Sequence, residues 1–263
     1  MALRDPVSRD QMQGIVERFR IDGEVKSCGP CGNGHINDTF SVTLSRVDGQ
    51  SPDYILQRIN DQVFTQVPEL MDNIRRVTNH IRNKLKEAPG RNPDRESLTL
   101  IPTVTGEPYL RDEKGDFWRS YTFINDAHTC DVVENPRLAR TAGAAFARFQ
   151  RLLADLPDPP LHETIPRFHD TPSRVEDLQQ AVAADPCGRV EDCREEIDFV
   201  NSYEDEVGTV VEALDDGSIP RRVTHNDTKI NNVMIDDETG RGICVIDLDT
   251  VMPGSALYDF GDM

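Results

Sequence analysis

The sequence has no long apolar run. None of its 263 residues lies in a stretch that approaches the roughly 20 consecutive apolar residues of a membrane-spanning helix. The first ten residues also lead into no apolar segment of the kind found in secretory signals. Six cysteines without such a signal indicate reduced thiols rather than a disulfide scaffold. We therefore expect a cytoplasmic protein with no membrane partner.

Positive charge is also scarce. The chain has 29 Lys and Arg residues against 47 Asp and Glu residues, which gives a formal net charge of −18. Nucleic acids and anionic membranes bind basic surfaces, so this balance argues against both as partners. Hydrophobic residues make up 37% of the chain, as in ordinary globular proteins, and the length allows one large domain or two small ones. Nothing in the sequence indicates the oligomeric state.

The hydrophobic pattern predicts a β-rich first half. Ser8 and Gln11 have the spacing of a capping box, which predicts a helix that continues to about Phe19. Alternating apolar residues then predict strands, and a helical period predicts one long helix. In chain order the predicted elements are strands over 25–28, 39–44 and 54–59, a helix over 67–85, a loop over 88–96, and strands over 98–103 and 118–124.

Beyond Asn125 the pattern becomes helical. The predicted elements are a helix over 139–153, an acidic helical region over 185–216 and a short β insert over 221–249. The apolar residues that we expect to face inward in the acidic region are Ile197, Val200, Val207, Val211 and Leu214. The sequence thus predicts an α+β protein whose two parts, 1–124 and 125–263, meet near Asn125.

The polar run His225–Asn232 (HNDTKINN) lies between two apolar segments. Phosphoryl transfer from ATP to a hydroxyl needs a carboxylate that accepts the hydroxyl proton, metal ligands for the triphosphate and a cation that offsets charge on the moving group. Asp227 suits the base, Lys229 the cation and Asn232 a metal ligand. Asp and Asn also favour turns, so a plain polar turn between two strands is the alternative.

A second ligand is expected at the end of the following strand. Asp247 lies fifteen residues after Asn232 and carries a hard oxygen donor of the kind that Mg²⁺ prefers. Strand alternation would put Asp249 on the same side as Asp247, where it could assist with a second metal or a water.

A glycine-rich turn over 32–40 (GNGHINDTF) lies between two predicted strands near the N-terminus. Gly32 and Gly34 would let the backbone approach phosphate oxygens, which successive N–H groups can bind. A glycine-rich hairpin with no ligand is the alternative, and the position of the turn ahead of HNDTKINN favours the phosphate interpretation.

HNDTKINN together with VIDLD resembles the catalytic and metal-binding loops of the aminoglycoside phosphotransferase and choline kinase superfamily. The longer string GNGHINDTF, YILQRIN, HNDTKINNVM and CVIDLDTVMPGSALYDFGD is most similar to one branch, the bacterial N-acetylhexosamine 1-kinases. The resemblance runs from the first helix to the last residue. It implies a two-lobed, protein-kinase-like α+β fold that uses ATP and Mg²⁺ to phosphorylate the anomeric hydroxyl of an N-acetylhexosamine.

The resemblance also implies roles for individual residues. Asp227 would be the catalytic base that acts on the sugar hydroxyl, and Lys229 its neighbour on the phosphate side. Asn232 and Asp247 would bind Mg²⁺. Gly32, Gly34 and Asn37 would belong to the loop that contacts the nucleotide, and His35 would lie near the sugar. The backbone of a hinge at Phe123–Asn125 would contact adenine.

Two features depart from the family. The strand-three lysine of many kinases is absent, with Gln57 at that position and Arg58 beside it; Arg58 is our candidate for phosphate contact, unless alternation directs it away. Glu69 is a candidate partner for that strand or a plain surface carboxylate. Family members also continue beyond the position of Met263, so the resemblance implies a residue 125–263 lobe that is incomplete.

Other classes of function remain open on the sequence alone. Cys28–Cys31 has the thioredoxin tetrapeptide, but no helix follows it to activate the thiol. A zinc site would combine this pair with Cys187 and Cys193 at unusual spacing. His169–Asp170 could be a hydrolase dyad, although no nucleophile elbow accompanies it. An inactive kinase-like protein, or a kinase acting on an aminoglycoside or amino alcohol, are further alternatives.

Overall fold

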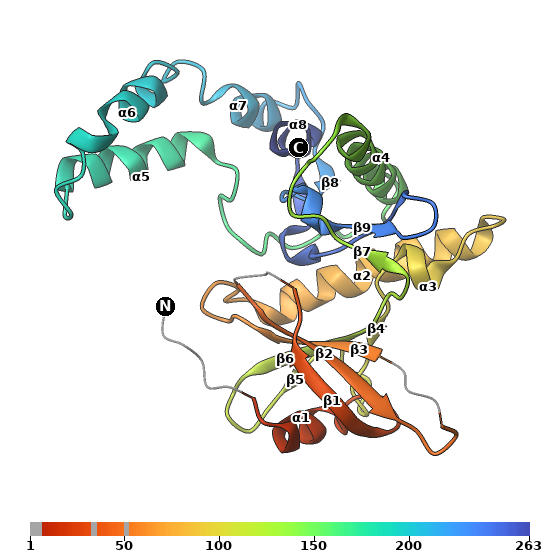
Figure 1. Cartoon of the computed structure of the whole chain (residues 1–263). Helices are drawn as coiled ribbons and strands as arrows, with labels where there is room; N and C mark the ends of the chain where they lie inside the picture. The colour runs from red at the N-terminus through yellow and green to blue at the C-terminus, as the bar shows by residue number, and fades with distance from the viewer. Residues whose placement is uncertain (1–6, 33–35, 50–52) are drawn as a thin grey trace.

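The structure is a computed structural model that describes residues 7–32, 36–49 and 53–263. Its first half is built on an antiparallel sheet (Figure 1). The strand order is β1-β2-β3-β6-β4, and β5 also pairs with β6. The strands are β1 (Glu24–Pro30), β2 (Asp38–Ser45), β3 (Asp53–Ile59), β4 (Leu100–Ile101), β5 (Leu110–Arg111) and β6 (Phe117–Thr122). The predicted strands are confirmed, with shorter β4 and longer β1.

One face of the sheet packs against α1 (Arg9–Val16). The capping box is confirmed, because the Ser8 side chain accepts from the Gln11 N–H and the Gln11 side chain accepts from the Ser8 N–H. The apolar side chains that fill this face include Met12, Val16, Val42, Leu44, Leu56 and Trp118. Since successive strand residues point to opposite faces, their neighbours in β3 and β6 point to the other side.

That other side is covered by α2 (Val67–Glu87). This confirms the helix that the apolar period predicted over 67–85. A short helix, α3 (Pro93–Glu96), follows where a loop was predicted. The Asn92 side chain accepts from the Asp94 N–H and caps α3. Within the Pro-rich segment, Asn92 and Pro93 thus start a short helix rather than a loop, because proline is tolerated in the first turn of a helix.

The second half combines helices with two small sheets. The sheets have the orders β10-β9-β7 and β11-β8. The strands are β7 (Ala127–His128), β8 (Arg222–Thr224), β9 (Val233–Asp236), β10 (Gly242–Val245) and β11 (Met252–Gly254). The main helices are α4 (Pro136–Leu153), α5 (Thr171–Ala184), α6 (Arg194–Asn201), α7 (Thr209–Asp215) and α8 (Ala256–Asp262), and the short 3₁₀ turns are η1 (Glu191–Cys193), η2 (Ile230–Asn232) and η3 (Leu248–Thr250).

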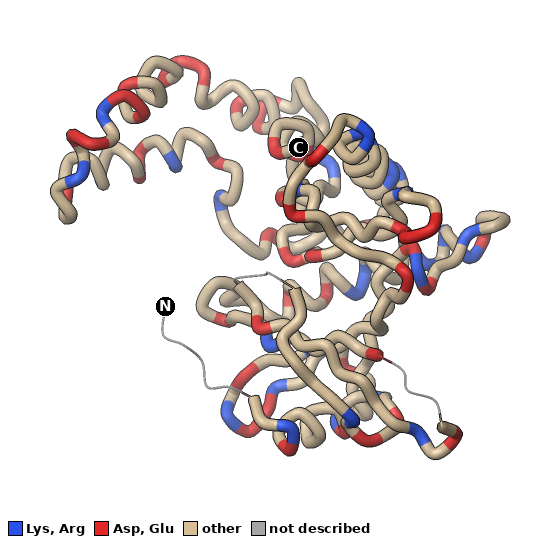
Figure 2. Tube along the Cα trace, in the orientation of Figure 1, with Lys and Arg blue, Asp and Glu red and all other residues tan. Residues whose placement is uncertain are grey.

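The helices α5, α6 and α7 form an arm that projects from the rest of the second half (Figure 1). Acidic residues follow one another along this arm (Figure 2). Of the five apolar residues expected to face inward, only Ile197 and Leu214 are buried. The prediction was too strong for the other three because the acidic region is broken into short helices that cover little core.

A single large core crosses the middle of the molecule. It joins sheet residues such as Ile59 and Tyr121 to α2, and α2 to α4, β9 and β10. The two halves on either side of the predicted boundary at 124/125 therefore share one apolar core. The division of the chain into two domains at this boundary stays a prediction. Within the described residues, no helix has the length and apolar character needed to cross a membrane.

Candidate active site

The loop His225–Asn232 is anchored by its first residue. His225 is fully buried, and its Nε2 lies 2.9 Å from the carbonyl oxygen of Ile246. Burial lowers the pKa of His225, which keeps the ring neutral so that Nε2–H can donate to that carbonyl. Phe146 and Phe149 meet the ring edge-on. The histidine thus ties the loop to the end of β10 and is part of the core.

Asp259 on α8 holds the backbone of the same loop. Its carboxylate accepts from the N–H groups of His225 (3.0 Å) and Asn226 (2.7 Å), and from Nε2 of Gln150 (2.6 Å). Asn226 has a φ of 65°, a left-handed conformation that needs such support. Thr228 Oγ1 donates to the Asp259 carbonyl at 2.8 Å. The site prediction omitted Asp259, because its partners become visible only when α8 packs beside the loop.

The loop brings together three of the predicted site residues. Asp227 Oδ2 accepts from Asn232 Nδ2 at 3.0 Å and lies 2.7 Å from Lys229 Nζ. Asn232 Nδ2 also donates to the Asp227 carbonyl at 2.8 Å. Both hydrogen bonds use the amide nitrogen of Asn232, so its Oδ1 is the atom suited to ligate a cation. The Lys229 side chain is half exposed, which leaves its amine free to turn toward a ligand.

Asp247 lies beside this loop. The Ile246 N–H donates to the Asn232 carbonyl at 2.9 Å, so the residue before Asp247 is bonded to the end of the catalytic loop. Asp247 has a φ of 58° and precedes η3. The pKa of Asp247 is raised to about 6, mainly because surrounding protein atoms exclude water from the carboxyl, and the carboxylates of Asp249 and Asp227 contribute to the rise. This concentration of carboxylate oxygen fits a divalent cation.

Asp249 does not take the place that strand alternation predicted. β10 ends at Val245, so Asp247 and Asp249 lie in a turn rather than on one strand. The Asp249 carboxylate instead pairs with Arg119 of β6 and accepts from Asn37 Nδ2 at 2.6 Å. The prediction that Asp249 assists with a metal or water is thus replaced by an ion pair in the core.

The glycine turn is described only at its ends. Gly32 has a φ of 77° and open space where a Cβ would lie, while Gly34 and His35, predicted to contact phosphate and sugar, lie outside the described residues. Asn37 Oδ1 accepts from the Asn60 N–H at 2.9 Å and its Nδ2 donates to Asp249. The structure therefore uses both ends of the Asn37 amide to hold the turn, rather than directing it toward a nucleotide.

Arg58 lies on the face of the sheet opposite Arg119 and Asp249. Its guanidinium pairs with Asp38 at 2.8 Å and Asp116 at 3.4 Å and lies over Trp118, on the side of the sheet that α1 covers. A phosphate contact by Arg58 would require it to cross the sheet, so the sequence assignment is corrected. The arginine on the other face, the α2 face, is Arg119, opposite Gln57 in the β3–β6 register. Burial lowers the pKa of Arg119, but the charge of Asp249 and its hydrogen bond to Arg119, with smaller contributions from Tyr121 and Asp247, together outweigh burial and raise it.

A family model described as the phosphotransferase enzyme family matches residues 27–263, which is most of the chain. The chain belongs to the phosphotransferase enzyme family. Its matched region contains the glycine turn, the loop around Asp227 and the turn at Asp247.

Solved structures share the kinase-like fold of this family member at low identity. A spectinomycin phosphotransferase in complex with ADP and spectinomycin is 13% identical, with a TM-score of 0.53, over 97% of this chain and 73% of the other. An amicoumacin kinase with AMP-PNP and Ca²⁺ is 15% identical, with a TM-score of 0.57, over 90% and 62%. A Plasmodium vivax ethanolamine kinase is 15% identical, with a TM-score of 0.51, over 89% and 58%. The chain thus spans between about three fifths and three quarters of these proteins.

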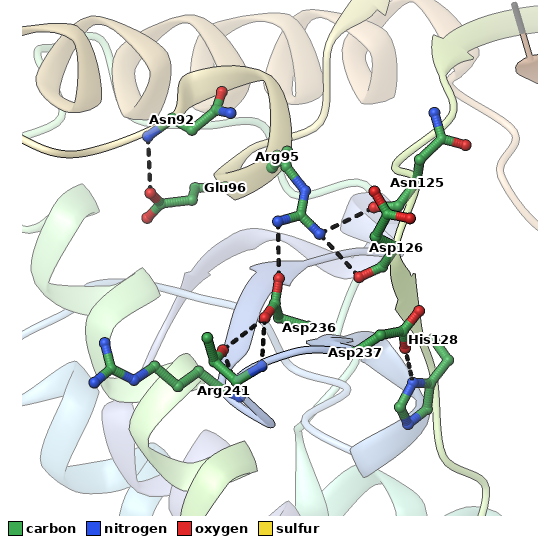
Figure 3. A network of polar contacts seen from close by, with 10 residues as sticks. Asn92, Arg95, Glu96, Asn125, Asp126, His128, Asp236, Asp237 and Arg241 are labelled. Carbon is green, nitrogen blue, oxygen red and sulfur yellow. Dashed lines mark hydrogen bonds and ion pairs between the residues drawn. The ribbon is translucent and has the colours of Figure 1, made fainter.

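The predicted hinge of this phosphotransferase family member is held from both sides, and Figure 3 shows the side that Arg95 holds. The Phe123 N–H donates to the Asp53 carbonyl at 3.2 Å. Arg95 of α3 donates to the carbonyls of Asn125 and Asp126 at 3.0 and 2.9 Å, and its other Nη atom donates to Asp236 at 2.8 Å. The Phe123 N–H is therefore already bonded and is not available to an adenine at the predicted hinge. The Asn125 carbonyl oxygen has one further lone pair with which it could accept a second hydrogen bond.

The alternative chemistries gain no support from the geometry. Cys28 and Cys31 are three positions apart along extended chain, roughly 10 Å between Cα atoms, which is too far for a disulfide. Both are free thiols. Among the described residues, no group of three or more His, Cys, Asp or Glu could hold a metal ion such as zinc. Asp170 caps α5 and pairs with Arg167, so it does not form a dyad with His169.

Proposed function

We propose that this chain is an ATP-dependent kinase that phosphorylates a hydroxyl group of a small molecule, with the anomeric hydroxyl of an N-acetylhexosamine as the first candidate acceptor. The observation that carries the proposal is the cluster of Asp227, Lys229 and Asn232 beside Asp247. These are the base, the cation and two oxygen ligands that phosphoryl transfer requires.

Asp227 accepts the proton of the acceptor hydroxyl. Oδ2 of Asp227 is already engaged by Lys229 and Asn232, so Oδ1 is the oxygen that orients the hydroxyl and takes its proton. The Lys229 amine, on a flexible and half-exposed side chain, turns toward the transferring phosphoryl group and offsets its charge. The bonds from Asp259 to the loop backbone keep Asp227 in place while this happens.

Asn232 Oδ1 and the Asp247 carboxylate would hold Mg²⁺. When bound, Mg²⁺ neutralises charge on the triphosphate. The solved structures with ADP, or with AMP-PNP and Ca²⁺, support the use of nucleotide and a divalent cation by proteins of this fold. In this proposal residues 1–124 bind the nucleotide and residues 125–263 carry the catalytic loop.

The acceptor is the least constrained part of the proposal. The motif string GNGHINDTF to CVIDLDTVMPGSALYDFGD supports the N-acetylhexosamine assignment. An aminoglycoside or amino alcohol is the second candidate, and the net charge of −18 and the acidic arm would suit such a cation. Six free cysteines agree with a reducing compartment such as the cytoplasm.

The test is ADP release with Mg·ATP over a panel of N-acetylhexosamines, aminoglycosides, choline and ethanolamine. Turnover with an N-acetylhexosamine supports the first acceptor, and turnover only with a cationic acceptor supports the second. Asp227→Ala should lower kcat by about 10²- to 10⁴-fold, the usual contribution of a general base, with nearly unchanged Mg·ATP affinity. Glu113→Ala, an exposed carboxylate in the turn between β5 and β6, is the matched control. Nucleotide binding without turnover of any acceptor would favour an inactive kinase-like protein.

A further inference from the structure

A buried ion pair joins the first-half sheet to the turn that follows Asp247. Arg119 and Asp249 have side-chain exposures of 1% and 3%. The guanidinium is bidentate, with Nη2 3.0 Å from Asp249 Oδ2 and Nη1 bonded to Oδ1. Its Nε donates to Gln57 Oε1 at 2.9 Å. The Arg119 guanidinium therefore lies beside Gln57, the strand position where many kinases have a lysine, but both of its Nη atoms are bonded to Asp249.

Asp249 also collects bonds from two other segments. Asn37, which follows the glycine turn, donates to Asp249 Oδ2 at 2.6 Å and accepts from the Asn60 N–H. Thr164 Oγ1 donates to the Asp249 carbonyl at 3.2 Å. The Asp249 carboxylate thus connects Asn37 and β6, and the Asp249 backbone adds the segment before α5, at a position two residues after Asp247.

Stability alone does not account for such a pair. Removing two charges from water costs about as much as their attraction returns, and apolar residues of similar volume often serve the fold as well or better. A planar arginine fork does, however, fix the direction of the carboxylate that it binds. Asp247 has a left-handed φ and leads into the one-turn η3 that contains Asp249, so fixing Asp249 fixes the course of the chain at Asp247.

We propose that Arg119 and Asp249 are positioning residues for the nucleotide site: they hold Asp247, the proposed metal ligand, and Asn37 in one fixed relation. This inference rests on the proposed function, because it assigns the pair a role in binding Mg·nucleotide. Neither residue touches the substrate. Arg119 acts through Asp249, and Asp249 acts through Asp247 and Asn37.

The test compares Arg119→Met, Asp249→Leu and the double variant. Calorimetry measures AMP-PNP affinity with and without Mg²⁺, and the melting temperature is measured on the same samples. Each single variant leaves one buried group unpaired and should melt earlier. The double variant should recover most of the melting temperature, yet bind Mg·AMP-PNP about tenfold or more weakly than wild type, the usual effect of losing a residue that orients a metal ligand. Metal-free AMP-PNP affinity should change less than about twofold.

Asn37→Ala provides a variant that keeps the buried pair, and it should weaken Mg·AMP-PNP in the same direction by a smaller factor. Val42→Ala, in the core on the α1 side, lowers stability without touching the network and should leave both affinities unchanged. Wild-type protein that gains no affinity from Mg²⁺ would overturn the proposed function itself. If wild-type binding of AMP-PNP depends on Mg²⁺, and both the double variant and Asn37→Ala keep that affinity in full, the positioning role alone is overturned.

Discussion

The two faces of the first-half sheet each contain a buried arginine paired with an aspartate, but the pairs connect different things. On the α1 face, Arg58 pairs with Asp38, twenty residues away in the neighbouring strand. On the α2 face, Arg119 pairs with Asp249, which is 130 residues away and belongs to the second half of the molecule. The same ion-pair chemistry therefore reinforces the sheet on one side and joins the sheet to the active site on the other.

Neighbouring positions in a strand can therefore have unrelated roles. Gln57 and Arg58 are adjacent in sequence, and alternation sends Gln57 to Arg119 on the α2 face and Arg58 to Trp118 on the α1 face. An arginine moved by one residue along β3 would therefore lie on the other face of the sheet. If the two faces are as distinct in function as they are in structure, substitutions on them should have different effects.

The largest effect should come from Asp247, in the half of the molecule that Arg119 contacts through Asp249. Loss of a residue that only orients a metal ligand typically weakens metal binding by about 10- to 100-fold. Asp247→Ala removes the proposed ligand itself and should weaken Mg·AMP-PNP binding by at least that much. The same variant should melt at the same temperature as wild type or higher when no metal is present. The pKa of Asp247 is raised to about 6, which means that folding disfavours its ionised form, and neutralising it relieves that penalty.

The measurement pairs calorimetric titration with thermal melting in excess chelator. A control is Asp237→Ala, which removes an exposed carboxylate paired with His128 and should change neither quantity by much. Full retention of Mg²⁺-dependent affinity in Asp247→Ala would show that the cation is held elsewhere.

A smaller, purely structural effect is expected on the α1 face. Arg58→Met removes the ion pair with Asp38 and should lower the free energy of unfolding by about 1–3 kcal/mol, less than for a fully buried pair because Asp38 is 39% exposed. Affinity for Mg·AMP-PNP should remain within about twofold of wild type, because the guanidinium lies behind the sheet.

Urea unfolding and nucleotide titration of this variant give the two numbers. A tenfold loss of nucleotide affinity with little change in stability would restore Arg58 as the phosphate contact that the sequence indicated, and would remove the distinction between the two faces.

Local sequence patterns predicted most of the fold. Ser8 and Gln11 marked the start of α1, and the helical period marked α2, because capping and amphipathicity are local properties. The grouping of Asp227, Lys229 and Asn232 could also be predicted, since one short loop contains all three. Two local predictions failed. The segment predicted as a loop contains the helix α3, and most of the apolar residues expected to be buried in the acidic arm are not, because its short helices contact little of the core.

Long-range partners could not be predicted in the same way. Nothing near Arg119 in the sequence distinguishes it from a surface arginine, and its importance comes from Asp249, which arrives from the other half of the chain. Asp259 is similar, because its carboxylate meets the loop at His225 and Asn226 only after α8 has packed. Alternation misled at Asp249 because a turn, rather than a strand, follows Val245.

The hinge offers a third arginine–aspartate pair, with the smallest expected effect. Arg95 and Asp236 are 141 residues apart, so like Arg119 and Asp249 they join the two halves, but the Arg95 side chain is one-third exposed. Bonds from Thr239 lower the pKa of Asp236 to about 2, and Arg95 contributes to the shift (Figure 3 shows the pair). An unfolded aspartate titrates near 3.9.

Because the folded pKa is the lower one, the stabilisation from ionised Asp236 is complete above about pH 4 and is lost as the pH falls through about 2. The difference in urea midpoint between wild type and Asp236→Asn should therefore be constant from pH 7 to 5 and shrink toward pH 2. Val42→Ala, which removes no titratable group, should show no such pH dependence in this difference. If the midpoint difference for Asp236→Asn persists unchanged to pH 2, the hydrogen bonds at the hinge, rather than the charge of Asp236, join the two halves there. Ion pairs would then join the two halves only where, as at Arg119 and Asp249, the pair is shielded from water.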